Sequence, residues 1–225
     1  MKTTQWMIFL ALGALLCDAA MAQKGAAAPA PHGGIAPLVP MVVAPPEVVA
    51  SAVAAVEKLG SEVTRGNYAV AIERMNPLWK ERLAKQTQGG MEEVKKQIEG
   101  ASARMTKEGV SIISSVPLGT PRSFEVGPGK KVERVNGEEI EILIFTKWMV
   151  FVPTLTKYRI FQKELKPVVI EKVGYQVAVS DKGKNDWTFI DGSRLTLNTL
   201  RRLYVTLPKD LELPPIEERK ASDNR

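Results

Sequence analysis

Apolar residues recur every three or four positions along much of the first half of the chain, which is the spacing of amphipathic helices. The first such run follows Pro46 and comprises Val49, Ala52, Val53, Val56, Leu59 and Val63. Asn67 can cap a second helix, which should end at Asn76 because a residue that precedes proline avoids the helical region. A further helix is predicted over residues 91–105. The first half is therefore predicted to be helical.

From Val110 onward the apolar residues alternate with polar ones, which is the period of β-strands. Asn136-Gly137 lies between two alternating runs and predicts a two-residue hairpin turn. One long strand should follow, with Ile140, Ile142, Ile144, Trp148 and Val150 on one face and Leu143, Phe145, Met149 and Phe151 on the other. Because both faces are apolar, both need cover.

A second hairpin is predicted toward the C-terminus. Its first strand carries Val173, Tyr175, Val177 and Val179 on one face, and a polar loop leads into Trp187 and Phe189. Thr196 can cap a short helix after this hairpin. For residues 153–167 a lid, a strand and an irregular crossover all remain open interpretations.

The first 22 residues have the pattern of a cleaved export signal, with one lysine, an apolar run and a small-x-small site before Gln23. Residues 23–46, rich in alanine, proline and glycine, are predicted to form an extended tether. An α+β domain over residues 47–207 and a C-terminal tail over residues 208–225 should follow. We therefore expect a periplasmic or extracellular protein without a transmembrane span after cleavage. Lipid attachment at Cys17 is the alternative, disfavoured by the two leucines that precede it.

Composition excludes several kinds of chemistry. Cleavage would remove the only cysteine, Cys17, and the only histidine, His32, lies in the tether. The folded domain then has no disulfide, no thiol nucleophile, no Ser-His-Asp triad and no histidine-bearing zinc site, so we predict no metal and no cofactor.

The net charge of +6 suggests an acidic partner, but Lys and Arg alternate with Glu along the chain. This pattern indicates a solvated surface and no specific nucleic-acid partner. Weak attraction to anionic envelope polymers or lipid head groups is an alternative.

Two short motifs resemble those of the nuclear transport factor 2-like superfamily. RGNYAVAIERMNP, residues 65–77, is similar to that family's early helix, and DWTFIDG, residues 186–192, is similar to its final-strand motif. The resemblance implies an α+β fold in which N-terminal helices pack on a curved antiparallel sheet, forming a cone with an internal cavity. Residues 179–215 also resemble the C-terminal part of uncharacterised exported bacterial proteins, which implies export and no particular activity.

Such a cone has a pocket between its helices and its sheet, and aromatic side chains commonly line small-molecule sites. The candidate pocket residues are Tyr68, Trp79, Trp148, Tyr175, Trp187, Asp191 and Arg194. For the aromatic residues the alternative is core packing, since aromatic side chains supply much of the buried area of most domains. Arg194 is an anchor for an acidic ligand, a partner of Asp191 or a solvated surface residue.

Asp191 allows two interpretations. It directly precedes Gly192, and Asp-Gly is a common turn pair, so we expect its carboxylate to accept hydrogen bonds from backbone N–H groups near residues 192–194. The resemblance also implies steroid isomerase-like and cyclase-like relatives, in which a carboxylate removes a proton beside an apolar pocket. Tyr68 or Tyr175 would then stabilise the oxyanion. We favour the turn.

The sequence thus predicts an exported, non-catalytic domain that binds a small apolar ligand or an envelope protein. An enzyme with a carboxylate general base is the alternative. A homodimer through the outer face of the sheet is also expected, because Leu143, Phe145, Met149 and Phe151 would otherwise form an exposed apolar patch.

Overall fold

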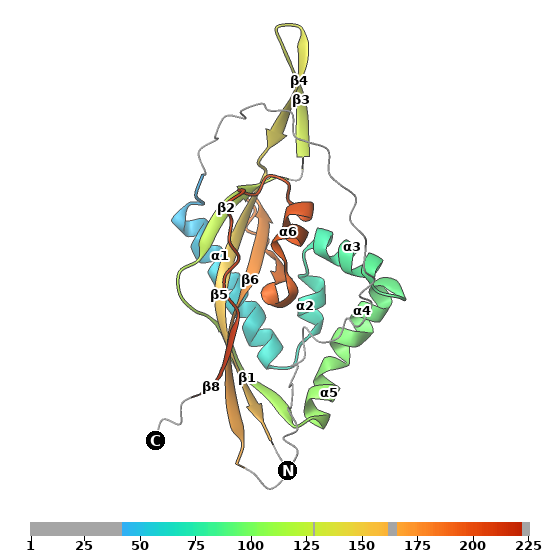
Figure 1. Ribbon diagram of the computed structural model, residues 1–225, viewed down its shortest axis with the longest axis vertical. Coiled ribbons are helices and arrows are strands. Elements are labelled where there is room, and N and C mark those ends of the chain that lie inside the picture. The colour runs from blue at the N-terminus through green and yellow to red at the C-terminus, as the bar shows by residue number, and fades with distance from the viewer. Residues whose placement is uncertain (1–41, 128, 162–165, 222–225) are drawn as a thin grey trace.

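The computed structural model describes residues 42–127, 129–161 and 166–221, and it confirms the predicted α+β class: helices pack with an antiparallel sheet (Figure 1). The helices are α1 (Pro46–Thr64), α2 (Ala69–Glu73), α3 (Pro77–Gln86), α4 (Gly90–Glu99), α5 (Ala101–Lys107) and α6 (Leu197–Leu203). The strands are β1 (Val110–Pro117), β2 (Arg122–Val126), β3 (Gly129–Val135), β4 (Glu138–Ile144), β5 (Lys147–Ile160), β6 (Val168–Asp181), β7 (Thr188–Asp191) and β8 (Glu217–Lys220). The predicted signal segment and most of the tether lie outside the described residues.

The helix boundaries follow local chemistry. Pro77 opens α3, and the side chain of the preceding Asn76 caps that helix by accepting from the Trp79 N–H at 3.3 Å. The prediction that Asn67 caps α2 is wrong. Its side chain instead donates to Glu62 at 2.9 Å, because the turn at Gly66 keeps it within reach of the last turn of α1.

Strands β5 and β6 form the centre of the sheet and pair antiparallel along their whole length, from Lys147 with Asp181 to Ile160 with Val168. On the edge of β5 away from β6, the short strands β2 and β1 pair one after the other. On the edge of β6 away from β5, the short strands β7 and β8 do the same. Of residues 153–167, which allowed several interpretations in the sequence, residues 153–160 are therefore the second half of a central strand, and residues 162–165 lie outside the described residues.

The prediction of one continuous strand over residues 140–151 is wrong. The chain leaves strand geometry after Ile144, and β4 pairs only with β3 among the described strands, whereas β5 joins the main sheet. The two backbones cross here so closely that a Cβ placed on Gly127 would lie 1.5 Å from the Ile144 carbonyl oxygen. The predicted turn at Asn136-Gly137 is confirmed, and both residues have positive φ, as this turn requires.

Both faces of the sheet are covered by the chain itself. Helix α1 packs on the face that carries Trp148, Val150 and Val152. On the other face Met149 and Phe151 are fully buried under α6 and the segment after it. Two of the four side chains that motivated the homodimer, Met149 and Phe151, are therefore covered within the chain and offer no exposed apolar surface to a second copy.

The ends of the domain extend beyond the predicted limits of 47 and 207. Ala44, in the predicted tether, is buried and donates its N–H to Ser123 at 3.0 Å. In the predicted tail, Leu211 belongs to the core and β8 pairs with β6. The described part of the tail thus contacts the body through Leu211 and β8.

Candidate functional site

A cavity of about 230 Å³ lies between helices α1 to α4 and the sheet. Its sheet wall includes alternate residues of β5 and residues paired with them on β6, such as Thr154 with Gly174, together with residues of β1 and β7. The helices contribute mainly apolar side chains, including Val56, Leu59, Ala71, Val94 and Ile98. These belong to the helical stripes visible in the sequence, so the periodicity that builds the core also lines the cavity.

Two glycines shape the cavity in opposite ways. A Cβ on Gly60 would lie 2.2 Å from the Ser115 carbonyl oxygen, so glycine allows α1 to approach β1 closely. A Cβ on Gly174 would meet only the Thr154 hydroxyl, at 4.0 Å. The missing side chain at Gly174 therefore leaves open space beside the sheet wall.

Polar groups are concentrated on the sheet side. Thr156 is hydrogen-bonded to Ser115 at 3.1 Å, Tyr158 lies two residues further along β5, and Lys172 pairs with Glu218 at 3.3 Å. On the helical side, the Gln97 side-chain amide donates to Glu93, while its Oε1 is buried without a hydrogen-bond partner in the described structure. Gln97 thus offers an unused acceptor at a largely apolar wall.

Asp191 ends β7 at the cavity wall. It pairs with Gln176 of β6, and both residues line the cavity. One carboxylate oxygen accepts from the Ser193 N–H at 2.9 Å, which caps the short 3₁₀ helix of residues 192–194. This is the hydrogen bond expected from the turn interpretation. Gly192, the second residue of the Asp191-Gly192 pair, has a packing role, because a Cβ at this position would lie 2.6 Å from the Tyr175 ring.

The negative charge of Asp191 contributes to the raised pKa of two tyrosines, Tyr175 and Tyr158. Burial raises the pKa of Tyr175 to about 12, and the Asp191 carboxylate adds to this increase. The pKa of Tyr158 is also raised, mainly by burial and further by Asp191 and Glu218. Both phenols therefore stay protonated at neutral pH and retain a proton that can be donated in a hydrogen bond.

The seven residues predicted for the pocket do not all meet there. Trp79, Tyr175, Asp191 and Arg194 line the cavity. Trp148 and Trp187 lie instead in the core beneath α1, where the Trp187 indole donates to Ser51 at 3.0 Å and Lys182 lies 4.8 Å from the Trp148 ring. Tyr68 is buried with its hydroxyl 3.8 Å from the Met105 sulfur, outside the lining.

Sequence reasoning missed Tyr158, Gln97, Lys172 and Gly174. The signal for Tyr158 was present, because Thr154, Thr156 and Tyr158 continue the alternation of Trp148, Val150 and Val152. Gly174 is an interior glycine in a strand pattern, which often marks an open space or a close approach.

Replacing Asp191 tests its role in the turn. Asp191→Ala should lower the free energy of unfolding by about 1 kcal/mol, the usual loss when a turn or cap acceptor is removed. Asp191→Asn keeps an oxygen that can accept from Ser193 and should retain most of the stability. Urea denaturation of both variants measures these values. An Asn variant more stable than the wild type would contradict the turn role, since it would mean that the cavity destabilises the charged carboxylate.

Within residues 42–127, 129–161 and 166–221, no group of three or more His, Cys, Asp or Glu side chains is placed to hold a metal ion. In the same residues no helix is long and apolar enough to cross a membrane.

No protein-family model matches the chain, and neither a curated protein nor a solved structure matches it significantly.

Proposed function

We propose that this protein is an exported, non-catalytic domain that holds a small, largely apolar ligand in the cavity between its helices and its sheet. The single observation that carries the proposal is the cavity of about 230 Å³, with an apolar helical wall and polar groups on the sheet side. Ligand sites in proteins commonly have this character. The N-terminal sequence pattern supports export, and the order of helices before an antiparallel sheet supports a nuclear transport factor 2-like cone.

The polar groups of the cavity indicate the chemistry of the ligand. An apolar body suits the side chains of α1, α2 and α4. A hydrogen-bond donor on the ligand would satisfy the buried Gln97 oxygen, and an acceptor would suit the protonated hydroxyl of Tyr158. We therefore propose an uncharged amphipathic ligand, with one donor and one acceptor.

Gly174→Leu is the most direct test, because the new side chain would enter the open space beside Thr154. We expect the variant to fold with unchanged or increased stability, since it fills a cavity and removes a strand glycine. It should lose the fluorescence enhancement that the wild type gives with an uncharged naphthylamine dye. Organic extraction of the purified protein, followed by mass spectrometry, should recover a small apolar compound from the wild type and not from this variant.

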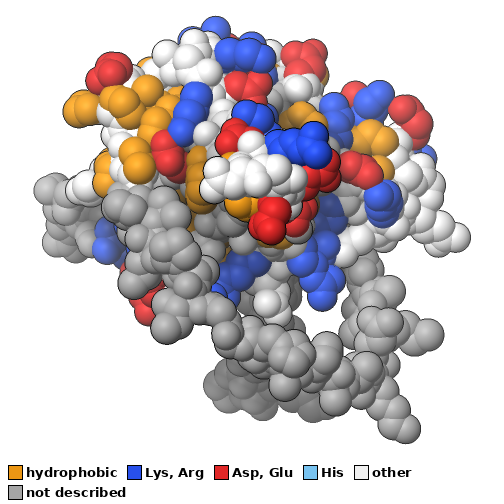
Figure 2. Space-filling model, turned by 90° about the horizontal axis from the view of Figure 1, so that it is seen from above, with side chains coloured by type: hydrophobic (Ala, Val, Ile, Leu, Met, Phe, Trp, Pro, Cys, Tyr) orange, Lys and Arg blue, Asp and Glu red, His pale blue; other side chains and the backbone are white. Residues whose placement is uncertain are grey.

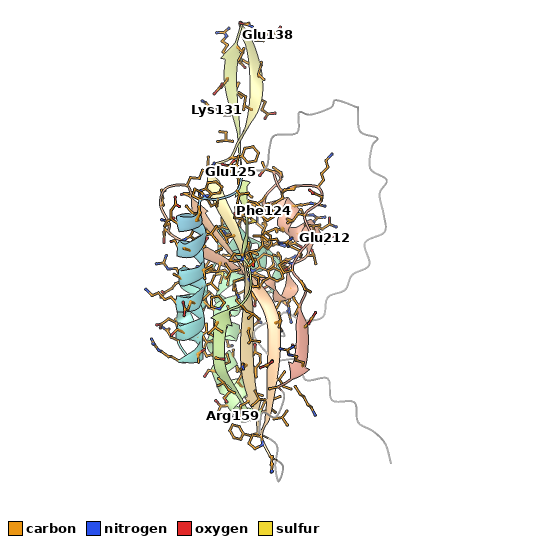
Figure 3. The ribbon with its side chains drawn as sticks, turned by 90° about the vertical axis from the view of Figure 1, so that its left-hand side faces the viewer. Phe124, Glu125, Lys131, Glu138, Arg159 and Glu212 are labelled. Atoms are coloured by element: carbon orange, nitrogen blue, oxygen red, sulfur yellow. The ribbon has the colours of Figure 1, made fainter. Side chains whose placement is uncertain are left out.

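Arg159→Leu is the matched control. It adds the same side chain at an exposed position of β5 that is not part of the cavity lining, at the end of the molecule opposite the β3–β4 hairpin (Figure 3). Its dye binding and extracted compound should match those of the wild type. Equal binding by the Gly174→Leu protein would place the ligand elsewhere and refute the proposal.

One observation favours the enzyme alternative: Asp191 lines the cavity and its charge acts on the phenols of Tyr158 and Tyr175. A carboxylate base beside a neutral hydroxyl is the arrangement used for proton abstraction next to a carbonyl. The Asp191→Asn protein separates the two functions. A binding protein should yield the same extracted compound as the wild type, whereas an enzyme should accumulate an unreacted precursor.

A further inference from the structure

The cavity reaches the surface at the edge of β6, between the two short strands that pair with that edge. Strand β7 pairs with residues 176–179 of β6, and β8 pairs with residues 170–173. The two residues between them line the cavity and have no strand partner on this edge within the described part of the chain. Arg194, after β7, and Ile216, before β8, also line the cavity, and both are exposed. The gap between β7 and β8 is therefore an opening of the cavity.

Other parts of the cavity wall are less suited to the entry of an apolar ligand. Val116 of β1 is also an exposed residue of the lining, but α1 lies directly against this strand. A Cβ on Gly60 would lie 2.2 Å from the Ser115 carbonyl oxygen, so the two backbones leave no passage between them. At the end of the molecule that carries the β3–β4 hairpin, Lys and Arg lie interspersed with Asp and Glu (Figure 2). Such a charged surface gives an apolar ligand no favourable way in.

Ile216 lies across the gap between β7 and β8. The last residue pair of β8 with β6 is Glu217 with Val173, and continuing this register by one position brings Ile216 beside Gly174. Gly174 has no side chain, and a Cβ there would meet only the Thr154 hydroxyl. Ile216 lines the cavity and is 42% exposed, so it separates the cavity from the solvent at this point.

Strand β8 holds Ile216 in place but is itself weakly attached. All four residues of β8 are exposed, and the strand pairs only with β6 among the described strands. Glu218 contacts Lys172 at 3.3 Å, and Arg219 contacts Glu171 at 3.1 Å. Ion pairs with an exposed partner contribute little to stability, and segments with few buried apolar contacts open more readily than the core. Strand β8 can therefore separate from β6 while the rest of the sheet stays folded.

The chain before Ile216 is firmly attached to the body. Leu211 is buried in the core, and Arg122 donates to the Glu212 carbonyl oxygen. Figure 3 shows Glu212 where this segment begins, with β8 continuing from it along the sheet. Two successive prolines, residues 214–215, restrict the chain between this anchor and Ile216. Movement is thus confined to Ile216 and β8.

We propose that β8 is a strap that opens to admit the ligand and then closes Ile216 over it. In the closed state, which is the one described, β8 is paired with β6 and Ile216 covers the gap. Separation of β8 from β6 releases Ile216 and opens the gap, while β7 and the core stay in place. The purpose of the strap rests on the proposed ligand cavity, whereas its motion can be measured without a ligand.

The first experiment measures access to the cavity by chemical labelling. The chain from Gln23 onward contains no cysteine, so Thr154→Cys places a single thiol on the cavity wall. Deletion of residues 217–225, which removes β8, should speed the reaction of this thiol with a methanethiosulfonate reagent by about tenfold or more. Val177→Cys is the control, because Val177 is fully buried on the opposite face of β6, and its labelling rate should not change on deletion. Equal rates for the Thr154→Cys thiol with and without β8 would overturn the proposal.

The second experiment locks β8 in the full-length chain with a disulfide. Glu171 pairs with Arg219 of β8 on one side and with Lys157 of β5 on the other, and none of the three lines the cavity. Glu171→Cys with Arg219→Cys links β6 to β8. Glu171→Cys with Lys157→Cys, which links β6 to β5, is the matched control. Directly paired residues of antiparallel strands have Cα atoms about 4.5 to 5.5 Å apart, within the range of a disulfide.

Release of a bound uncharged naphthylamine dye is then followed for both double variants, oxidised and reduced, after circular dichroism and thermal melting have verified that they fold. Oxidation of the β6–β8 pair should slow dye release by about tenfold or more, and reduction should restore the wild-type rate. Oxidation of the control pair should leave the rate unchanged. Equal release from the oxidised and reduced β6–β8 protein would overturn the strap but leave the ligand cavity in place. A wild type that binds no dye would refute the proposed function, and the labelling of the Thr154→Cys thiol would still decide whether β8 opens.

Discussion

Phe151→Ala is expected to lower the free energy of unfolding by about 3 to 5 kcal/mol, the usual cost of truncating a buried phenylalanine. Phe151 is fully buried, and its ring meets Phe124 edge to face at a centroid distance of 5.6 Å. Tyr175 lies on its other side at 6.0 Å. The truncation would remove both aromatic contacts and leave a cavity in the core between β5 and α6. Urea denaturation of the variant and the wild type measures the difference.

The same variant distinguishes burial of Phe151 within the chain from burial against a second subunit. If Phe151 faced a second subunit, its truncation would give a stable monomer with greater solubility. Phe161→Ala is the matched control, because Phe161 is 52% exposed at the end of β5. It should change the stability by less than about 1 kcal/mol. A Phe151→Ala protein as stable as this control would contradict the intramolecular packing.

Asn76→Ala is expected to lower the free energy of unfolding by about 2 to 3 kcal/mol, because one side chain makes three hydrogen bonds at a buried position. Its oxygen caps α3 at Trp79, and its amide donates to Thr188 at 3.1 Å and to Tyr204 at 3.0 Å. Asn76 is only 3% exposed. It therefore joins α3, β7 and the segment after α6, and its loss should weaken all three contacts.

Asn76→Asp distinguishes the capping of α3 from the junction that Asn76 forms between α3, β7 and the segment after α6. Asparagine and aspartate are about equally good N-caps, so a residue that only capped α3 would tolerate the exchange. Here the carboxylate would lose both donors and place a charge at a buried position, so Asp should be at least as destabilising as Ala. Thr196→Ala, at the exposed N-cap of α6, should cost only about 1 kcal/mol. An Asn76→Asp protein as stable as the wild type would refute the junction.

Local features were predictable from the sequence because the residues that cause them lie close together in the chain. Asn136-Gly137 forms its turn, Thr196 caps α6, and Asp191 accepts from Ser193. Asn67 failed as a cap because a neighbouring turn of helix competed for its side chain. The failed prediction for Asn67 shows the limit of a capping propensity, because another nearby residue can form a hydrogen bond with the same side chain.

The candidate site was predictable only in part. Alternation tells which side chains of a strand share a face, but it does not tell which helix covers that face or how closely. Trp79 belongs to a core cluster and also lines the cavity, whereas Trp148 and Trp187 lie under α1 in the core and are not part of the lining. Further along the same face, Gly174 and the threonines of β5 leave space, and there the cavity forms.

By itself, the sequence determined the α+β class, the starts of α1 and α6 and the turn at Asn136-Gly137, because hydrophobic period and capping act over a few residues. The single helix predicted over residues 91–105 is wrong, because the chain divides at Gly100 into α4 and α5. Only the tertiary structure decided that the run of residues 140–151 divides into β4, which pairs with β3, and β5, which joins the main sheet, since the division depends on the approach of Gly127 to Ile144. It also decided that α6 and the segment around Leu211 cover Met149 and Phe151. These contacts join residues far apart in the chain, and no local pattern specifies which distant segment will bury an apolar face.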